Sequence, residues 1–193
     1  LGSRQRMVDR GKMPPSAHDF ALKDLDFSRS EDFFLVRSDP EKKECAWLFF
    51  PGCQLCATHP EQVEAAYTWL RENLDGGVGL ALACCGAPAH WGGRQELFQA
   101  SSRQLQSAVQ ELGSPRWIAA CPSCQSVLEL MDPAPNQISL WEVLGLEKAN
   151  LQGANLRQAV LSKTNLEKAN LRGANLQGGT LAGVTGGKAS MEG

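Results

Sequence analysis

The sequence predicts an α/β protein in which a parallel sheet with flanking helices, in the order βαβαβα, is followed by a repetitive tail. Over residues 45–145, short apolar runs alternate with segments of helical periodicity, a pattern typical of parallel sheets covered on both faces. Cysteines follow the ends of the apolar runs. From Ala149 onward, leucine returns with a period of five residues, which fits neither a helix nor a strand.

Four apolar runs are the expected strands. The run "CAWLFF" at 45–50 is closed by Pro51 and Gly52, and "VGLALA" at 78–83 is the second strand. The third and fourth strands are expected at 116–120 and 137–144.

Helices are expected between these strands. The first spans "THPEQVEAAYTWLRENLDGG", with Thr58 as a candidate cap, Pro60 in the first turn and two glycines as the stop. A second covers about 94–112, and "SCQSVLELM" begins a third.

Composition excludes several classes of protein. The chain has 193 residues and a net charge of −2 without a basic block, so no nucleic-acid partner is expected. No apolar run approaches the roughly 20 residues of a membrane span, and no signal peptide is visible. Seven cysteines in such a chain favour a metal or redox site in a reducing, cytoplasmic compartment. Cys45, inside an apolar run, is explained as a small buried side chain.

The other cysteines are expected to converge. Cys53, Cys84, Cys85, Cys121 and Cys124 all follow strand ends or open helices. These positions share one edge of a parallel sheet, where helix N-termini also favour thiolates. Zinc would take four thiolates, whereas five ligands that include an adjacent pair favour a multi-iron centre.

The cysteine pattern resembles the cysteine-rich CCG domain of the heterodisulfide reductase family and related iron–sulfur oxidoreductases. The matching pieces are "FPGCQL" at 50–55, "CCGAPAHWGG" at 84–93 and "ACPSCQSVLE" at 120–129. The resemblance implies a noncubane [4Fe-4S] cluster, with zinc as the alternative metal. Its ligands would be the same five residues, Cys53, Cys84, Cys85, Cys121 and Cys124. Gly86 and Pro122 would lie beside the cofactor, and glycine would let the backbone approach it closely.

Three further side chains lie near the motif in the sequence. Cys56 could be a spare or substitute ligand, but Cys53 occupies the position of the family motif. His59 and His90 are expected to be surface or capping residues rather than metal ligands.

The tail resembles the pentapeptide-repeat family, whose fold is a right-handed β-helix. Leucine occupies the centre of each unit, with a small residue two positions earlier; these leucines are Leu151, Leu156, Leu161, Leu166, Leu171, Leu176 and Leu181. The resemblance implies that leucines and small residues point inward. It also implies that five polar residues face water, namely Gln152, Arg157, Lys163, Glu167 and Arg172.

These patterns predict four segments: a charged N-terminal segment at 1–44, a cluster-binding domain at 45–145, repeats at 146–183 and a flexible end at 184–193. Two functions remain open. The first is an iron–sulfur oxidoreductase subunit or electron-transfer module, with a flavoprotein or iron–sulfur protein as its redox partner. The second is a zinc-stapled or metal-free binding domain, with the repeats as an interaction surface. The N-terminal segment could cover the sheet or contact a partner.

Overall fold

The computed structural model describes residues 2–14, 17–42, 44–145, 152–154 and 166–179. The chain forms two compact units, Leu1–Gln137 and Ile138–Gly193. Among the described residues, no helix has the length and apolar character needed to cross a membrane.

A five-stranded sheet in the order β1-β3-β2-β4-β5 organises the fold. Its strands are β1 Leu35–Arg37, β2 Trp47–Phe50, β3 Val78–Leu82, β4 Arg116–Ala119 and β5 Gln137–Ser139. Strand β2 runs parallel to both β3 and β4, so that Leu48 lies opposite Gly79 on one side and Trp117 on the other. The predicted parallel sheet is therefore correct for these three central strands.

The sheet as a whole is mixed, and the expectation of a purely parallel sheet was wrong. Strand β1 pairs with β3 in the antiparallel sense, with Leu35 opposite Leu82. This strand comes from the N-terminal segment, whose short apolar thread has no pattern long enough to predict a strand. It covers the edge of β3 that the β2 pairing leaves open.

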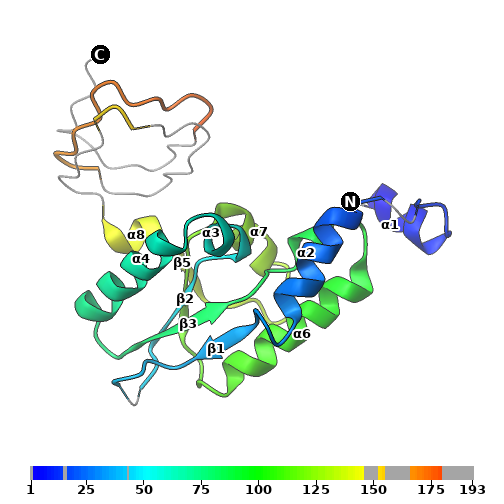
Figure 1. Ribbon diagram of the computed structural model, residues 1–193, viewed down its shortest axis with the longest axis horizontal. Helices are drawn as coiled ribbons and strands as arrows, with labels where there is room; N and C mark the ends of the chain where they lie inside the picture. Colours follow the sequence, from blue (N-terminus) through cyan, green and yellow to red (C-terminus); the bar gives the residue numbers. More distant parts are fainter. Residues whose placement is uncertain (1, 15–16, 43, 146–151, 155–165, 180–193) are drawn as a thin grey trace. The chain divides into compact units, whose positions relative to one another are not determined.

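Helices lie between and around the strands (Figure 1). They are α1 Gly2–Asp9, α2 Asp19–Arg29, α3 Cys53–Thr58, α4 Pro60–Asn73, α5 Ala87–Trp91, α6 Gln95–Gln110, α7 Pro122–Leu128 and α8 Leu140–Leu144. Helices α4 and α6 confirm the two long predicted helices. Helix α6 buries Phe98, Leu105 and Val109 on one face, as the spacing of its apolar residues requires.

The predicted fourth strand at 137–144 is strand only over β5, because a helix follows at once. The Ser139 hydroxyl accepts a hydrogen bond of 3.3 Å from the backbone N–H of Trp141. A serine at this position satisfies one of the free N–H groups of a helix start. The apolar run therefore continues as α8 and ends at Gly145, which has a positive φ of 47°.

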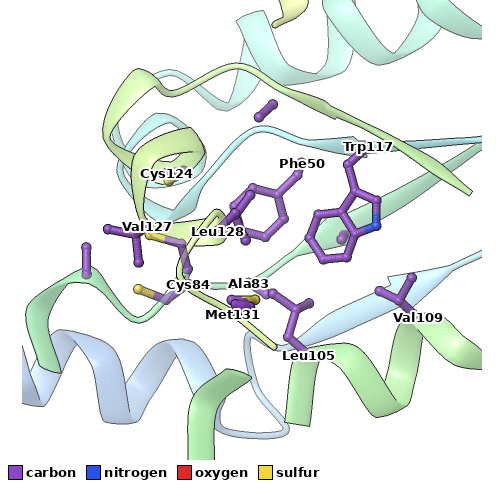
Figure 2. Packing of buried hydrophobic residues seen from close by; sticks show 14 of the residues in the cluster. Phe50, Ala83, Cys84, Leu105, Val109, Trp117, Cys124, Val127, Leu128 and Met131 are labelled. Carbon is purple, nitrogen blue, oxygen red and sulfur yellow. The ribbon is translucent and has the colours of Figure 1, made fainter. Parts of the chain in front are cut away.

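The core lies between the sheet and the helices that cover it (Figure 2). The rings of Phe50 in β2 and Trp117 in β4 pack at 5.7 Å, and Leu105 of α6 and Leu128 of α7 are buried in the same cluster. Each such side chain contributes about 1.5–3 kcal/mol when it is withdrawn from water. Cys84, Cys85 and Cys124 belong to this cluster, so the core itself holds them in place.

A buried carboxylate fixes the start of β3. Asp39 accepts hydrogen bonds from the backbone N–H groups of Val78 at 3.0 Å and Glu41 at 2.9 Å, and it lies 3.4 Å from Arg71 Nε. Burial alone would raise the pKa of Asp39, but the backbone hydrogen bonds and Arg71 outweigh it and lower the pKa to about 2. The loop before β2 is thereby tied to β3 and α4.

In the second unit, the described residues include part of the repeat region. Leu166, Ala169 and Leu171 are buried, as the repeat pattern predicted. Backbone hydrogen bonds of 2.9 Å connect Gly153 N–H to the Arg172 carbonyl and Asn175 N–H to the Ala154 carbonyl. These bonds join segments that are distant in sequence, as stacked repeats would.

The asparagine of two repeats stabilises the turn that follows it. The Asn170 side-chain oxygen accepts from Arg172 N–H at 3.2 Å, and that of Asn175 accepts from Gln177 N–H at 3.1 Å. Gln152 and Arg172 are exposed as expected, while Glu167 is half-buried. The expectations for Leu151, Leu156, Leu161, Leu181, Arg157, Lys163 and the end at 184–193 lie outside the described residues. The right-handed β-helix stays a prediction.

Candidate metal centre

Three neighbouring strand ends deliver the predicted cysteines to one place. Cys53 is the first residue of α3 after β2, and Cys84 and Cys85 follow β3. Cys121 precedes α7 at the end of β4, and Cys124 lies within α7. Because β3, β2 and β4 are adjacent and parallel, their carboxyl ends share one edge of the sheet. All five cysteines line a single cavity of about 340 Å³.

The five side chains form a continuous row. The pKa of each thiol depends on its neighbour, from Cys53 to Cys84 and from Cys84 to Cys85. The same dependence continues from Cys85 to Cys124 and from Cys124 to Cys121. The row therefore joins residues that follow β2, β3 and β4. Figure 2 shows two of its members, Cys84 and Cys124, among the core side chains.

The thiols of the row fall into two groups, one with lowered and one with raised pKa values. Hydrogen bonds from Cys124 and then Cys84 lower the pKa of Cys85 to about 5, despite its burial. A hydrogen bond from Cys124 likewise lowers the pKa of Cys121 to about 6. Hydrogen bonds with its neighbours Cys121 and Cys85 raise the pKa of Cys124, and its burial adds to the rise. Cys85 and Cys121 are thus the two thiols that ionise easily at neutral pH, because hydrogen bonds from neighbouring thiols stabilise their thiolate forms.

The remaining two thiols hold their protons more firmly. The hydrogen bond with Cys84, followed by burial, raises the pKa of Cys53 well above its usual range. For Cys84, the hydrogen bond from Cys53 lowers the pKa, but the bond to Cys85 and burial outweigh it and raise the value to about 12. A metal that binds the row must replace these protons, so binding would release them.

Backbone amides at the starts of three short helices also point to the sulfurs. The N–H groups that donate are those of Gln54 to Cys53, Gly86 to Cys84, Ala87 to Cys85, and Ser123 and Cys124 to Cys121. Each bond favours the thiolate form of its cysteine. This edge of the sheet is therefore built to hold negative charge on sulfur.

Gly52 provides the space in which the row is packed. Its φ of +86° is a backbone conformation that side chains disfavour, and a Cβ there would lie 3.0 Å from Cys124 Sγ. The sequence pattern marked Gly52 only as a turn residue and did not predict this contact. The available signal was its position directly before Cys53, after a proline that closes the strand.

Gly86 and Pro122 flank the row, but neither lines the cavity. Gly86 has a φ of +85°, and a Cβ there would lie 2.9 Å from a ring carbon of Phe98. The positive φ and the packing of Phe98 therefore both favour glycine at this position. Pro122 is the first residue of α7, where its missing N–H costs no helix bond.

The other two cysteines do not line the cavity of the row. Cys45 precedes β2, at the opposite end of the strand from Cys53, and its Sγ lies 3.3 Å from the Trp47 carbonyl. Cys56 lines a different cavity, beside Tyr67 and Leu80. Burial raises the pKa of Cys45, and it raises that of Cys56 to about 11.

The two histidines near the motif do not line the cavity either. The His90 ring packs against Phe98 with centroids 5.2 Å apart, and burial lowers the pKa of His90. His59 is exposed, with Nδ1 2.9 Å from the hydroxyl of Thr58.

The N-terminal segment forms part of the cavity wall. The sequence alone had not decided between this role and contact with a partner. Phe20, Ala21, Asp24 and Leu25 of α2 line it together with the cysteines. Helix α2 runs beside α6 (Figure 1), where the Gln104 amide donates to the Arg29 carbonyl at 3.0 Å.

Helix α1 also packs against the α5 side of the site. Arg4 donates to the Trp91 carbonyl at 2.8 Å, and a Cβ on Gly93 would lie 2.7 Å from the Arg4 backbone. Phe20 and Trp91, which both line the cavity, are 79% and 45% exposed, so they mark its opening to solvent.

The arrangement of the five sulfurs bears on whether the row could hold a single metal ion or a cluster of several metal atoms. Across the described residues, no group of three or more histidine, cysteine or acidic side chains is arranged to hold a metal ion. A row of five sulfurs cannot place all its members around one tetrahedral ion, which takes four ligands. A cluster of several metal atoms instead offers separate binding points along its surface. The thiols, the amides and the space at Gly52 fit such a cluster.

The fold and this row define a cysteine-rich α/β domain with five thiols along one cavity. Residues 47–129 match the family model of the cysteine-rich domain, CCG. Residues 146–184 match pentapeptide repeats, in eight copies. No curated protein and no solved structure matches the chain. The chain thus carries a CCG cysteine-rich domain followed by pentapeptide repeats, as the resemblance predicted, and the domain supports a metal-binding role of the iron–sulfur type.

Proposed function

We propose that the cysteine-rich domain holds a noncubane [4Fe-4S] cluster and acts as a heterodisulfide-reductase-like subunit, either in electron transfer or in disulfide reduction. The observation that carries the proposal is the row of five cysteines along one cavity wall. Its ligands would be Cys53, Cys84, Cys85, Cys121 and Cys124.

The residues of this chain have distinct roles in the proposal. The amides of Gly86 and Ala87 stabilise negative charge on the ligand sulfurs. Gly52 leaves room beside Cys124 that any side chain would fill. Cys85 and Cys121, whose pKa values are lowered to about 5 and 6, would supply thiolate ligands most readily.

Helix α2 keeps bulk water from the cysteine wall, while the opening beside Phe20 and Trp91 admits a small sulfur compound. When bound, the cluster supplies one-electron transfer and iron atoms with affinity for sulfur. Two electrons from a partner, proposed to be a flavoprotein or an iron–sulfur protein, would reduce one disulfide. The setting is a reducing, cytoplasmic compartment, with neither nucleic acid nor membrane insertion involved.

Anaerobic purification of the full chain tests this function. We expect brown protein with iron and acid-labile sulfide in equal amounts, and an electron paramagnetic resonance signal that changes when a disulfide is added to the oxidised or reduced protein. Reduced methyl viologen should then support disulfide reduction. A colourless protein that contains stoichiometric zinc would favour the alternative, a zinc-stapled binding domain, and would refute the proposal.

A further inference from the structure

The charge of the cavity wall limits which sulfur compounds can enter. Apart from the cysteines, the described residues that line it are apolar or uncharged polar side chains, with the exception of Asp24 on α2. Within the described part of the chain, no lysine, arginine or histidine lines the cavity. An anion that entered would find a carboxylate and no cation.

The backbone offers an anion little more. The amides of Gln54, Gly86 and Ala87 point to the sulfurs of Cys53, Cys84 and Cys85. The N-terminal ends of α3 and α5 therefore face the sulfurs of the row itself.

The opening has an apolar character. Phe20 and Trp91, both exposed, lie along the cavity together with Leu55 and Pro88. Aromatic side chains at a concave opening bind the apolar body of a small ligand.

We propose that the compound which reacts at this cavity is a small uncharged thiol or disulfide with an apolar or aromatic body, and that thiols carrying carboxylate, sulfonate or phosphate groups are excluded. This inference rests on the proposed function and names its substrate class. In the disulfide direction, one R–S–S–R accepts two electrons from the reduced partner protein and two protons from solvent, and two R–SH leave. Burying an anionic group without a cation would oppose its entry.

Reactivity of the cavity thiols tests the charge preference directly. The full chain with Cys45→Ser and Cys56→Ser, freed of metal, retains only the thiols of the row. Its reaction rate at neutral pH is measured with uncharged 4,4′-dithiodipyridine and with dianionic 5,5′-dithiobis(2-nitrobenzoate), each divided by the rate with 2-mercaptoethanol. After this correction, we expect the uncharged reagent to react at least about tenfold faster, as unscreened like charges at short range require.

Two variants on α2 distinguish the effect of a charge inside the cavity from the effect of a charge on the exposed surface. Asp24→Asn should raise the anionic-to-neutral rate ratio several-fold, whereas Asp26→Asn, at an exposed position of the same helix, should leave the ratio unchanged. Equal corrected rates, or a faster anionic reagent, would overturn the inference, as would cavity thiols that react with neither reagent. Failure of the chain to bind iron would refute the proposed iron–sulfur function but would not change the anionic-to-neutral rate ratio, which is measured on the metal-free chain. The proposed function and the charge preference can therefore be refuted independently.

Discussion

Cys53 and Cys84 follow the ends of two neighbouring parallel strands, line the same cavity and shift each other's pKa. Their proximity depends on the β2–β3 pairing, which sets Trp47 opposite Val78. The cysteine row is therefore a product of strand register rather than of a local loop. Changes to the row or to the space beside it should alter metal content, while changes far from the row should leave it intact.

The first prediction concerns ligation. Cys84→Ser and Cys85→Ser should each sharply lower the iron and sulfide content, because each removes a thiolate from the centre of the row. Cys45→Ser is the matched control, since Cys45 lies at the other end of β2. An equal loss of iron in the Cys45 variant would show that the ligand set is misassigned.

A second prediction concerns the space beside Cys124. Gly52→Ala and Gly113→Ala both introduce a Cβ at positive φ, but only the first meets a neighbour, Cys124 Sγ at 3.0 Å. Both should lose about 1–2 kcal/mol of unfolding free energy from backbone strain. Only Gly52→Ala should also lose metal, measured as iron per folded chain. Full iron content in that variant would show that the row tolerates displacement.

The sequence predicted the cysteine edge well because it depends on only two regularities. One apolar run, which ends at Pro51 and Gly52, predicted β2, and another, which ends at Cys84 and Cys85, predicted β3. The site residues directly follow these two runs. The mixed edge was missed because β1 has three residues, too few for a pattern. Whether the N-terminal segment covers the fold was left open, because the contact of Leu25 with the core depends on tertiary packing. The role of Gly52 was missed because a close approach between residues far apart in sequence leaves no periodic signal.

The third prediction is a pH dependence. Asp39 has a folded pKa of about 2, below its ordinary value of 3.8. Its contribution to stability, about 2 kcal/mol, is fully present above pH 4 and is lost as the pH falls toward 2. Asp39→Asn should therefore be less stable at neutral pH, and its unfolding free energy should vary less with pH in this window.

Glu41→Gln is the control for this measurement. Glu41 pairs with the same Arg71, at 3.0 Å, but its side chain is 79% exposed. An exposed pair of this kind contributes about 0–1 kcal/mol, so its removal should change stability little. Urea unfolding at several pH values measures both variants. A larger loss for Glu41→Gln than for Asp39→Asn would contradict the role assigned to Asp39.

A fourth prediction concerns the repeats. Leu171→Asp places a charge at a buried position and should unfold the repeats, whereas Gln177→Asp, at an exposed position, should not. Neither variant should lower the iron content, because the cysteine row lies within the first compact unit. Limited proteolysis reports the state of the repeats. Loss of iron in Leu171→Asp would show that the metal site needs them.

The central claim is that five cysteines from three strand ends hold one iron–sulfur cluster. The most direct measurement is the iron, sulfide and zinc content of the anaerobically purified full chain, compared with that of the Cys84→Ser variant. The account predicts equal amounts of iron and sulfide, with little zinc, in the unaltered chain and a sharp loss of both in the variant. A chain that carries zinc alone, or whose iron survives the loss of Cys84, would contradict it.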